Sequence, residues 1–201
     1  MVIAGISGFY DQKRAFRAYV ESRSWDIYQK YSIVYTVEAS MRGYARKFQE
    51  DEDRWAIAGL LHDFDWEICP TPEEHPNFGA GILQEHGYPD DIIRAVLIHG
   101  DHTGIPRESL MEHTLFPVDE LAGFIRAVAL VRPSKSLGDV SPRSVRSKMK
   151  DKNFAKDANR DDIARGAEEL GIDLDEQIAF IVESMKPVSE RIDLVAEPSE
   201  K

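Results

Sequence analysis

The sequence predicts an all-α protein that folds as a compact helical bundle. Apolar residues recur at the three- and four-residue spacing of helices along nearly the whole chain. No stretch has the polar and apolar alternation of a strand, and there is no internal repeat. The 201 residues, 42% of them hydrophobic, suffice for one sizeable domain. We therefore expect a single domain over residues 1–201, with its core in about 25–185, a helix before it and a helical extension after it.

Five helices are predicted in the first half of the chain, and several have clear start or stop signals. A run of three acidic residues favours a helix start, Pro89 is typical of a first turn, and Gly87 and Gly100 are typical helix ends. These helices span residues 11–22, 25–48, 51–62, 77–86 and 89–99.

Proline residues set most of the expected boundaries in the second half. Pro117 predicts the start of a helix that ends before Pro133, and Pro187 predicts a kink in the last helix. The predicted helices span 117–131, 142–150, 160–170 and 174–195. The longest stretches predicted to be irregular are 64–76, 100–116 and 132–141.

Charge and cysteine content restrict the classes of function. A net charge of -11 and a pI of about 5.0 argue against broad nucleic-acid binding, which needs a basic face, although a local basic patch is compatible with them. Cys69 is the single cysteine, so no intrachain disulfide can form. The apolar runs are too short to span a membrane, and the N-terminus does not resemble a signal peptide. We expect a cytoplasmic protein without membrane contact; its oligomeric state stays open.

Two predicted helices carry a histidine at the end of an apolar face. His62 shares its face with Trp55, Ala58 and Gly59, whereas His99 shares its face with Ile92, Ala95 and Val96. Both histidines should therefore point inward near a helix C-terminus. Asp63 adjoins the first of them, in the stretch LLHDFDWEICPTPEEH (residues 60–75).

Imidazoles and carboxylates that converge inside a protein favour a divalent metal. Imidazole suits Zn, Fe, Mn or Ni, and a metal would also compensate buried carboxylates. We interpret His62, Asp63, His75 and His99 as such a set. Asp119 can join it from the first turn of helix 117–131, where Ala122 and Gly123 allow close helix approach.

The other histidines and acids have simpler interpretations. His86 precedes Gly87 and can compensate a helix dipole, and His113 lies in a predicted polar loop. His102 is either a turn residue or a substrate contact. Asp65 and Glu67 can simply be solvated, and Asp119 alone could be an ordinary first-turn acid.

The segment AGLLHDFDWE resembles the histidine-aspartate doublet of the HD-domain superfamily of metal-dependent phosphohydrolases. The likeness continues in order through EEHPNFGAGIL, PDDIIRAVLIHG, PVDELAGFIRAVALVRPSK and SVRSKMKDKNFAKDANRDDI. The resemblance covers about residues 30–185, and the chain is most similar to the small single-domain bacterial members of the superfamily. The resemblance implies a helical bundle of the HD-domain type.

The resemblance also implies a role for each residue of the set. His62 and Asp63 would be metal ligands, and Asp63 would bridge two ions if two bind. His75 and His99 match the extra histidines of two-metal members, and Asp119 matches the distal aspartate. The implied cofactor is one or two divalent ions, which the sequence does not distinguish among Mn, Fe, Zn, Ni and Mg.

The sequence departs from the family pattern at its first ligand. The family has a histidine about 30 residues before the doublet, where ungapped counting places Ile33, and no histidine precedes His62 in this chain. Ile33 shares a mostly apolar face with Val37 and Ser40, so we expect it to face inward. The residues that could replace the missing ligand are Tyr31, Tyr35 and Glu38.

The resemblance implies hydrolysis of a phosphate ester in a small molecule or a nucleotide. Asp63 and His102 would be the catalytic residues, and either His75 or His102 could position phosphate or move a proton. A cationic cluster could bind the substrate anion, or could be a solvated face; it comprises Arg132, Lys135, Lys148 and Lys152. Two other functions stay open: a degenerate HD domain that binds a ligand or partner without turnover, and an HD-type di-iron oxygenase.

Overall fold

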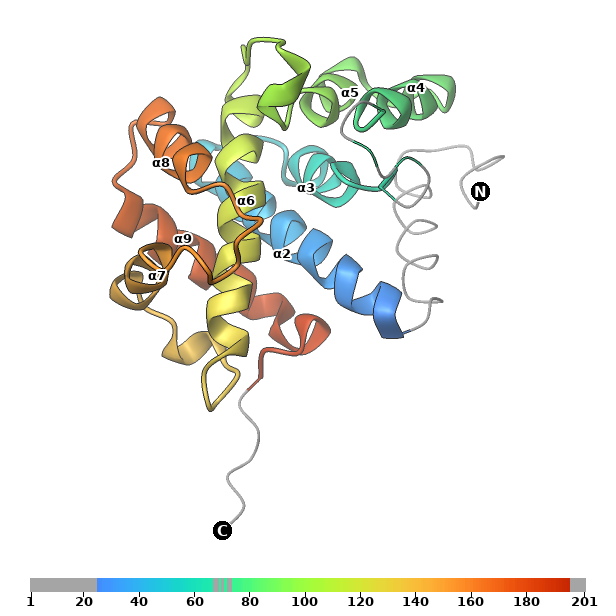
Figure 1. Cartoon of the computed structure of the whole chain (residues 1–201). Coiled ribbons are helices and arrows are strands. Elements are labelled where there is room, and N and C mark those ends of the chain that lie inside the picture. Colours follow the sequence, from blue (N-terminus) through green and yellow to red (C-terminus); the bar gives the residue numbers. More distant parts are fainter. Residues whose placement is uncertain (1–24, 67–68, 70, 72–73, 196–201) are drawn as a thin grey trace.

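The protein is all-α over the residues that the computed structural model describes. These are residues 25–66, 69, 71 and 74–195, with side chains from Ser32 onward. They form eight α-helices and three short 3-10 helices, and no strand occurs among them (Figure 1). The predicted fold class is thereby confirmed. The helix predicted over 11–22 lies outside the described residues.

The observed helices follow the predicted order closely. The α-helices are α2 (Trp25–Phe48), α3 (Glu52–Leu61), α4 (Asn77–Glu85), α5 (Asp90–Leu97), α6 (Leu110–Leu130), α7 (Pro142–Met149), α8 (Arg160–Glu169) and α9 (Leu174–Met185). The 3-10 helices are Asp101–Thr103, Leu137–Asp139 and Lys186–Ile192. None of the helices in this described part of the chain combines the length and the apolar character needed to cross a membrane.

Helix α6 runs through the middle of the bundle (Figure 1). It packs against α2 and α3 on one side and against α7, α8 and α9 on the other. Helices α4 and α5 lie at one end of the bundle, where they pack against each other and α5 contacts α3. This arrangement brings the C-terminal ends of α3 and α5 near the middle of α6.

The start of α6 differs from the prediction. The helix begins at Leu110, because Ser109 and Glu112 form a capping box in which each side chain accepts a backbone N–H at the other residue. Pro117 therefore lies inside the helix, and its ring packs against Gly166 of α8, where a β-carbon would lie 2.3 Å from the Pro117 Cβ. His113 consequently belongs to this helix and not to a polar loop.

The last predicted helix, 174–195, ends earlier as an α-helix. Helix α9 stops at Met185, and the chain continues as the 3-10 helix Lys186–Ile192. Pro187 occupies the first turn of this 3-10 segment, where the missing N–H costs no helical hydrogen bond. The predicted kink at Pro187 is thus a change of helix type.

Candidate metal centre

His62 is fixed at the end of α3, deep in the bundle. Helix α3 can approach α2 closely because a β-carbon at Gly59 would lie 3.0 Å from the Val37 carbonyl oxygen. The His62 ring is fully buried, and its Nδ1–H donates to the Gly59 carbonyl at 2.8 Å. In the neutral ring the lone pair is therefore on Nε2, which lies 3.4 Å from Asp63 Oδ2 and 3.1 Å from Asp119 Oδ1.

His99 is held in the same way after α5. Its Nδ1–H donates to the Val96 carbonyl at 2.6 Å. Its Nε2 atom lies 3.4 Å from Asp63 Oδ1 and 3.2 Å from the Nε2 atom of His75. Each of the two helices is thus followed by a histidine whose Nδ1–H donates to the carbonyl three residues earlier and whose Nε2 faces the interior.

The carboxylate of Asp65 orients His75. Asp65 is fully buried; its Oδ1 accepts from His75 Nδ1–H at 2.7 Å and its Oδ2 accepts the Gly79 N–H at 2.8 Å. A β-carbon at Gly79 would lie 2.7 Å from that Oδ2 atom, so only glycine permits this approach. The solvated interpretation of Asp65 is therefore wrong, while Glu67 lies outside the described residues.

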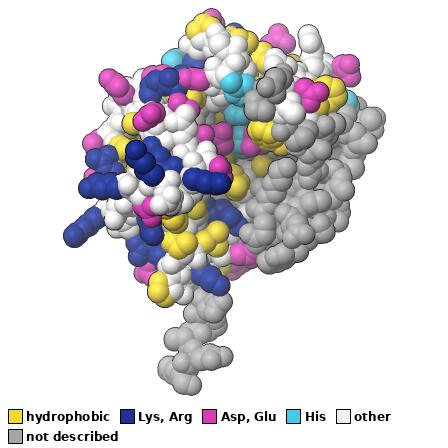
Figure 2. Space-filling model, viewed as in Figure 1, with side chains coloured by type: hydrophobic (Ala, Val, Ile, Leu, Met, Phe, Trp, Pro, Cys, Tyr) yellow, Lys and Arg dark blue, Asp and Glu magenta, His cyan; other side chains and the backbone are white. Residues whose placement is uncertain are grey.

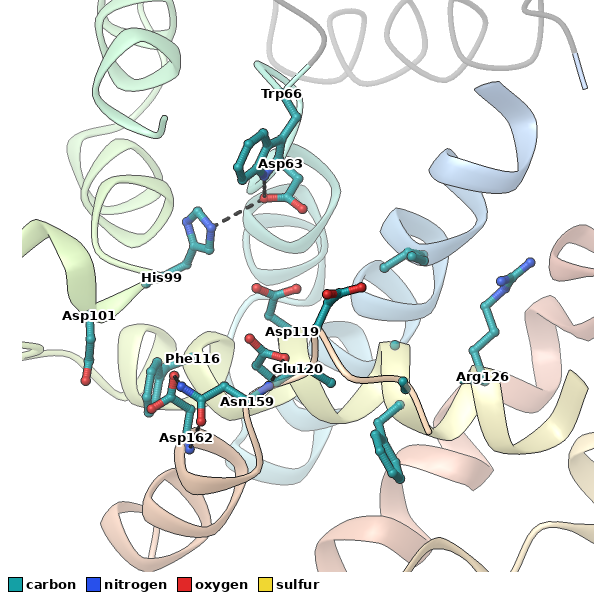
Figure 3. A pocket seen from close by; sticks show the side chains of 18 of the residues that line it. Asp63, Trp66, His99, Asp101, Phe116, Asp119, Glu120, Arg126, Asn159 and Asp162 are labelled. Atoms are coloured by element: carbon teal, nitrogen blue, oxygen red, sulfur yellow. Dashed lines mark hydrogen bonds and ion pairs between the residues drawn. The ribbon is translucent and has the colours of Figure 1, made fainter. Parts of the chain in front are cut away.

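Asp63 lies between the three histidines and is shared by them. Its Oδ2 faces His62, whereas its Oδ1 lies 3.3 Å from His75 Nε2 and 3.4 Å from His99 Nε2. The indole N–H of Trp66 donates to the same Oδ1 at 3.0 Å (Figure 3). The Trp66 ring also stacks on His75, with centroids 4.5 Å apart.

Two groups of potential metal ligands result, and Asp63 belongs to both. One group comprises His62, Asp63 and Asp119; the other comprises Asp63, His75 and His99. Within each group the ligand atoms all lie within 4.8 Å of one another. The structure thus brings together all five residues that the sequence analysis assigned to a metal.

The donor set fits divalent metals. Each histidine Nδ1–H is already committed to an oxygen, the arrangement that orients metal-binding imidazoles in proteins. The Nε2 atoms of His75 and His99 face each other at 3.2 Å, a contact that needs a proton or a cation between two lone pairs. The buried Nε2 atom of His62 has no hydrogen bond of good geometry to the described residues.

Electrostatics within the cluster favour protonated histidines when no metal is bound. Burial alone would lower the pKa of His75, but its hydrogen bonds to Asp63 and Asp65 outweigh burial and raise it to about 9. Burial likewise opposes protonation of His62, yet the charges of Asp63 and Asp119 raise its pKa well above the usual value. Burial would raise the pKa of Asp63, but His62 holds it well below its usual range.

We predict that the metal-free protein loses stability as the pH rises from about 6.5 to 9. A histidine whose pKa rises on folding, from about 6.5 to about 9 for His75, contributes stability that is complete below the unfolded value and is lost as pH passes the folded one. The melting temperature of chelator-treated protein measures this, and His75→Gln should show a smaller loss. An equal loss in both proteins would contradict the assignment to His75.

The ligand cluster opens into a pocket of about 760 Å³. Figure 2 shows histidine and acidic side chains inside a hollow of the surface, and Figure 3 shows Asp63, His99 and Asp119 facing it. His102 lies at the rim, where its Nε2–H donates to the His75 carbonyl at 3.0 Å. A β-carbon at Gly100 would lie 2.7 Å from the His102 ring, so glycine allows the ring to lie there.

The structure does not bring the predicted cationic cluster to this pocket. None of its four residues is among the described residues that line the pocket. Lys152 lines a neighbouring depression together with Lys150 and Lys156. Lys148 lies over the Phe154 ring, 4.8 Å from its centroid. Lysine and arginine side chains nevertheless gather on the surface beside the hollow, over α7 and α8 (Figure 2).

Ile33 lines the pocket and is 36% exposed, whereas its helical face predicted that it points inward. Tyr35 and Glu38, two of the residues proposed to replace the missing ligand, are buried and do not line the pocket. The Arg191 guanidinium lies over the Tyr35 ring, and Glu38 Oε1 lies 3.8 Å from Arg42 Nη2. The side chain of Tyr31, the third, lies outside the described residues.

The remaining histidines have structural partners. The Nδ1–H of His86 donates to the Ile82 carbonyl at 2.8 Å at the end of α4, in agreement with the helix-end interpretation. His113 Nδ1 lies 3.0 Å from Oε2 of Glu169 in α8. Neither residue lines the pocket.

Several pocket residues were missed by the sequence analysis. Trp66 follows the doublet closely, and Arg126 interrupts an apolar helical run, a signal that was available. Glu120 also lines the pocket and accepts the Asn159 N–H at 3.0 Å; burial and the neighbouring Asp119 raise its pKa to about 7. Residues near Asn159 reach this site only through the packing of α8 on α6, which sequence spacing does not reveal.

Comparison with known families places this geometry in context. A family described as HD domain matches residues 34–181 of the chain. The comparisons with curated proteins and with solved structures found no match. The family match includes all five candidate metal ligands.

Proposed function

The chain belongs to the HD-domain family, and we propose that it is a metal-dependent phosphohydrolase acting on a small phosphorylated metabolite or a nucleotide. The observation that carries this proposal is the sharing of Asp63 between two groups of ligands at the base of a pocket. Adjacent sites bridged by one carboxylate suit phosphate-ester chemistry, in which both the attacking and the leaving oxygen need stabilisation.

The ligand sets leave room for substrate at each metal. His62, Asp63 and Asp119 would hold one ion, and Asp63, His75 and His99 would hold the other. Three protein ligands are typical of catalytic sites, because open positions remain for water and substrate. When bound, such ions lower the pKa of a water ligand and neutralise charge on phosphate oxygens.

Neighbouring side chains would hold the reacting groups in place. Trp66 fixes Asp63 Oδ1 with its indole N–H and keeps the His75 ring stacked against it. His102 commits Nε2–H to the His75 carbonyl, so its Nδ1 is the atom available to accept a proton or contact a phosphate oxygen at the rim. Metal binding displaces protons from His62 and His75, so affinity should increase with pH.

The test combines elemental analysis with turnover on a panel of phosphate esters. We expect bound Mn, Fe, Zn or Ni, or rescue by one of them, and release of inorganic phosphate that a chelator abolishes. Metal or ligand binding without turnover of any phosphate ester would instead support the degenerate HD domain. Bound iron with oxygen consumption would support the di-iron oxygenase.

A further inference from the structure

The pocket continues along α6 well beyond the metal ligands. Asp119, Gly123, Ala127 and Leu130 follow one another at spacings of four, four and three residues, so they lie on one face of the helix. The eleven residue steps from Asp119 to Leu130 correspond to about 16 Å of helix. A phosphate group at the metal ligands would therefore occupy only one end of the pocket.

The distal end of the pocket is lined mainly by apolar residues. Its apolar residues are Ile33, Gly123, Phe124, Ala127, Leu130 and Ala155, and the buried Arg126 also lines the pocket. Three of them, Gly123, Ala127 and Leu130, are partly exposed on a helix whose neighbouring residues are buried. An accessible helix face is normally polar, so an accessible apolar face beside a metal centre indicates an apolar ligand group.

Gly123 lies beside Ile33 of α2 in this part of the pocket. A β-carbon at Gly123 would lie 3.9 Å from Ile33 Cγ2, an ordinary van der Waals contact, so the predicted close helix approach does not require glycine here. The side chain of Ile33 thus packs beside Gly123, one turn along α6 from Asp119. A larger side chain at either position would alter the space next to the metal ligands.

From this geometry we infer that the substrate is a phosphate ester of an elongated, apolar alcohol, whose apolar part lies along α6 beside Ile33, Ala127 and Leu130. This inference rests on the proposed function and specifies its substrate class. The accessible side chains of Ile33, Ala127 and Leu130 offer no hydrogen bonds, so sugars and bases would leave polar groups unpaired there. An apolar group gains from burial at the same place.

Binding of alkylphosphonates tests the inference independently of turnover. Methyl-, butyl- and octylphosphonate would be titrated into the full chain by calorimetry, with and without added Mn²⁺, beside a nucleoside monophosphate. Each buried methylene increases affinity by about fourfold, whereas ordering the alkyl chain costs conformational entropy. After this cost, octylphosphonate should still bind at least about thirtyfold tighter than methylphosphonate. The nucleoside monophosphate should bind more weakly than octylphosphonate.

A matched pair of variants locates the effect. Ile33 and Val131 are both exposed apolar residues, but only Ile33 lines the pocket. Ile33→Ser should reduce the preference for octyl- over methylphosphonate by at least about threefold, whereas Val131→Ser should retain it. Gly123→Leu, which fills the space, should reduce the preference as well.

The outcomes separate this inference from the proposed function. The apolar substrate class would be overturned if affinity did not depend on chain length, or if octylphosphonate did not bind or bound more weakly than the nucleoside monophosphate. An equal change of the preference in Ile33→Ser and Val131→Ser would overturn it as well. Failure to release phosphate from any ester would overturn the hydrolase proposal instead. A chain-length effect without turnover would still place an apolar phosphate ester in this pocket.

Discussion

Asp63→Ala should abolish metal binding at both positions and lower phosphate-ester hydrolysis by at least about a thousandfold. Asp63 contributes to both ligand groups, and two catalytic metals together supply several kcal/mol of stabilisation in the transition state. Helical content should be almost unchanged, because the residue follows α3 and its side chain is 30% exposed. Elemental analysis, circular dichroism and the rate of phosphate release measure the three effects.

A surface aspartate provides the control for this variant. Asp139 is exposed in the 3-10 helix Leu137–Asp139 and does not line the pocket. Asp139→Ala should keep the metal content and activity of the original protein. Unchanged metal stoichiometry in Asp63→Ala would contradict the assignment of Asp63 as the shared ligand.

Asp65→Asn should lower affinity at the position formed by His75 and His99 by about 10- to 100-fold, the usual effect of losing a carboxylate that orients a ligand histidine. Asp65 accepts hydrogen bonds from both His75 Nδ1 and the Gly79 N–H. The asparagine oxygen can serve only one of them. If the asparagine oxygen accepts the Gly79 N–H, the amide NH₂ faces His75 Nδ1, which must then accept a hydrogen bond. The ring proton of neutral His75 is then on Nε2, where it blocks metal binding.

The position of the proton on the His75 ring can be measured directly. In the variant, ¹⁵N NMR of the metal-free protein at alkaline pH should show His75 with its proton on Nε2, whereas the original protein should show it on Nδ1. Asp139→Asn serves as the control for charge removal. An unchanged tautomer together with unchanged Mn²⁺ affinity would show that Asp65 does not orient His75.

Helical periodicity was enough to predict most of the bundle and two of its inward histidines. His62 and His99 end apolar faces, and the regular backbone fixes the direction of such side chains. The start of α6 was also readable, because Ser109 and Glu112 have the spacing of a capping box. Pro117 does not mark the helix start that it predicts, because it lies within α6 with its ring packed against Gly166 of α8.

Other features depend on contacts that a single helix does not determine. Asp65 is buried only because His75 and Gly79, ten and fourteen residues later, fold back onto it. Periodicity assigned Ile33 to the interior, but it does not distinguish a packed core from the wall of a pocket. The predicted cations are close in sequence, yet helix α7 and the turns that flank it place them outside the pocket.

The most direct test of this account is an anomalous-scattering map from crystals of the Mn²⁺-loaded protein. Two peaks are expected, one on each side of the Asp63 carboxylate, about 3.5–4 Å apart as in two-metal phosphate enzymes. One peak should lie near His62 and Asp119, and the other should lie near His75 and His99. A map without metal at Asp63, or with Mn²⁺ bound only to other residues, would contradict the central claim that Asp63 joins two metal positions.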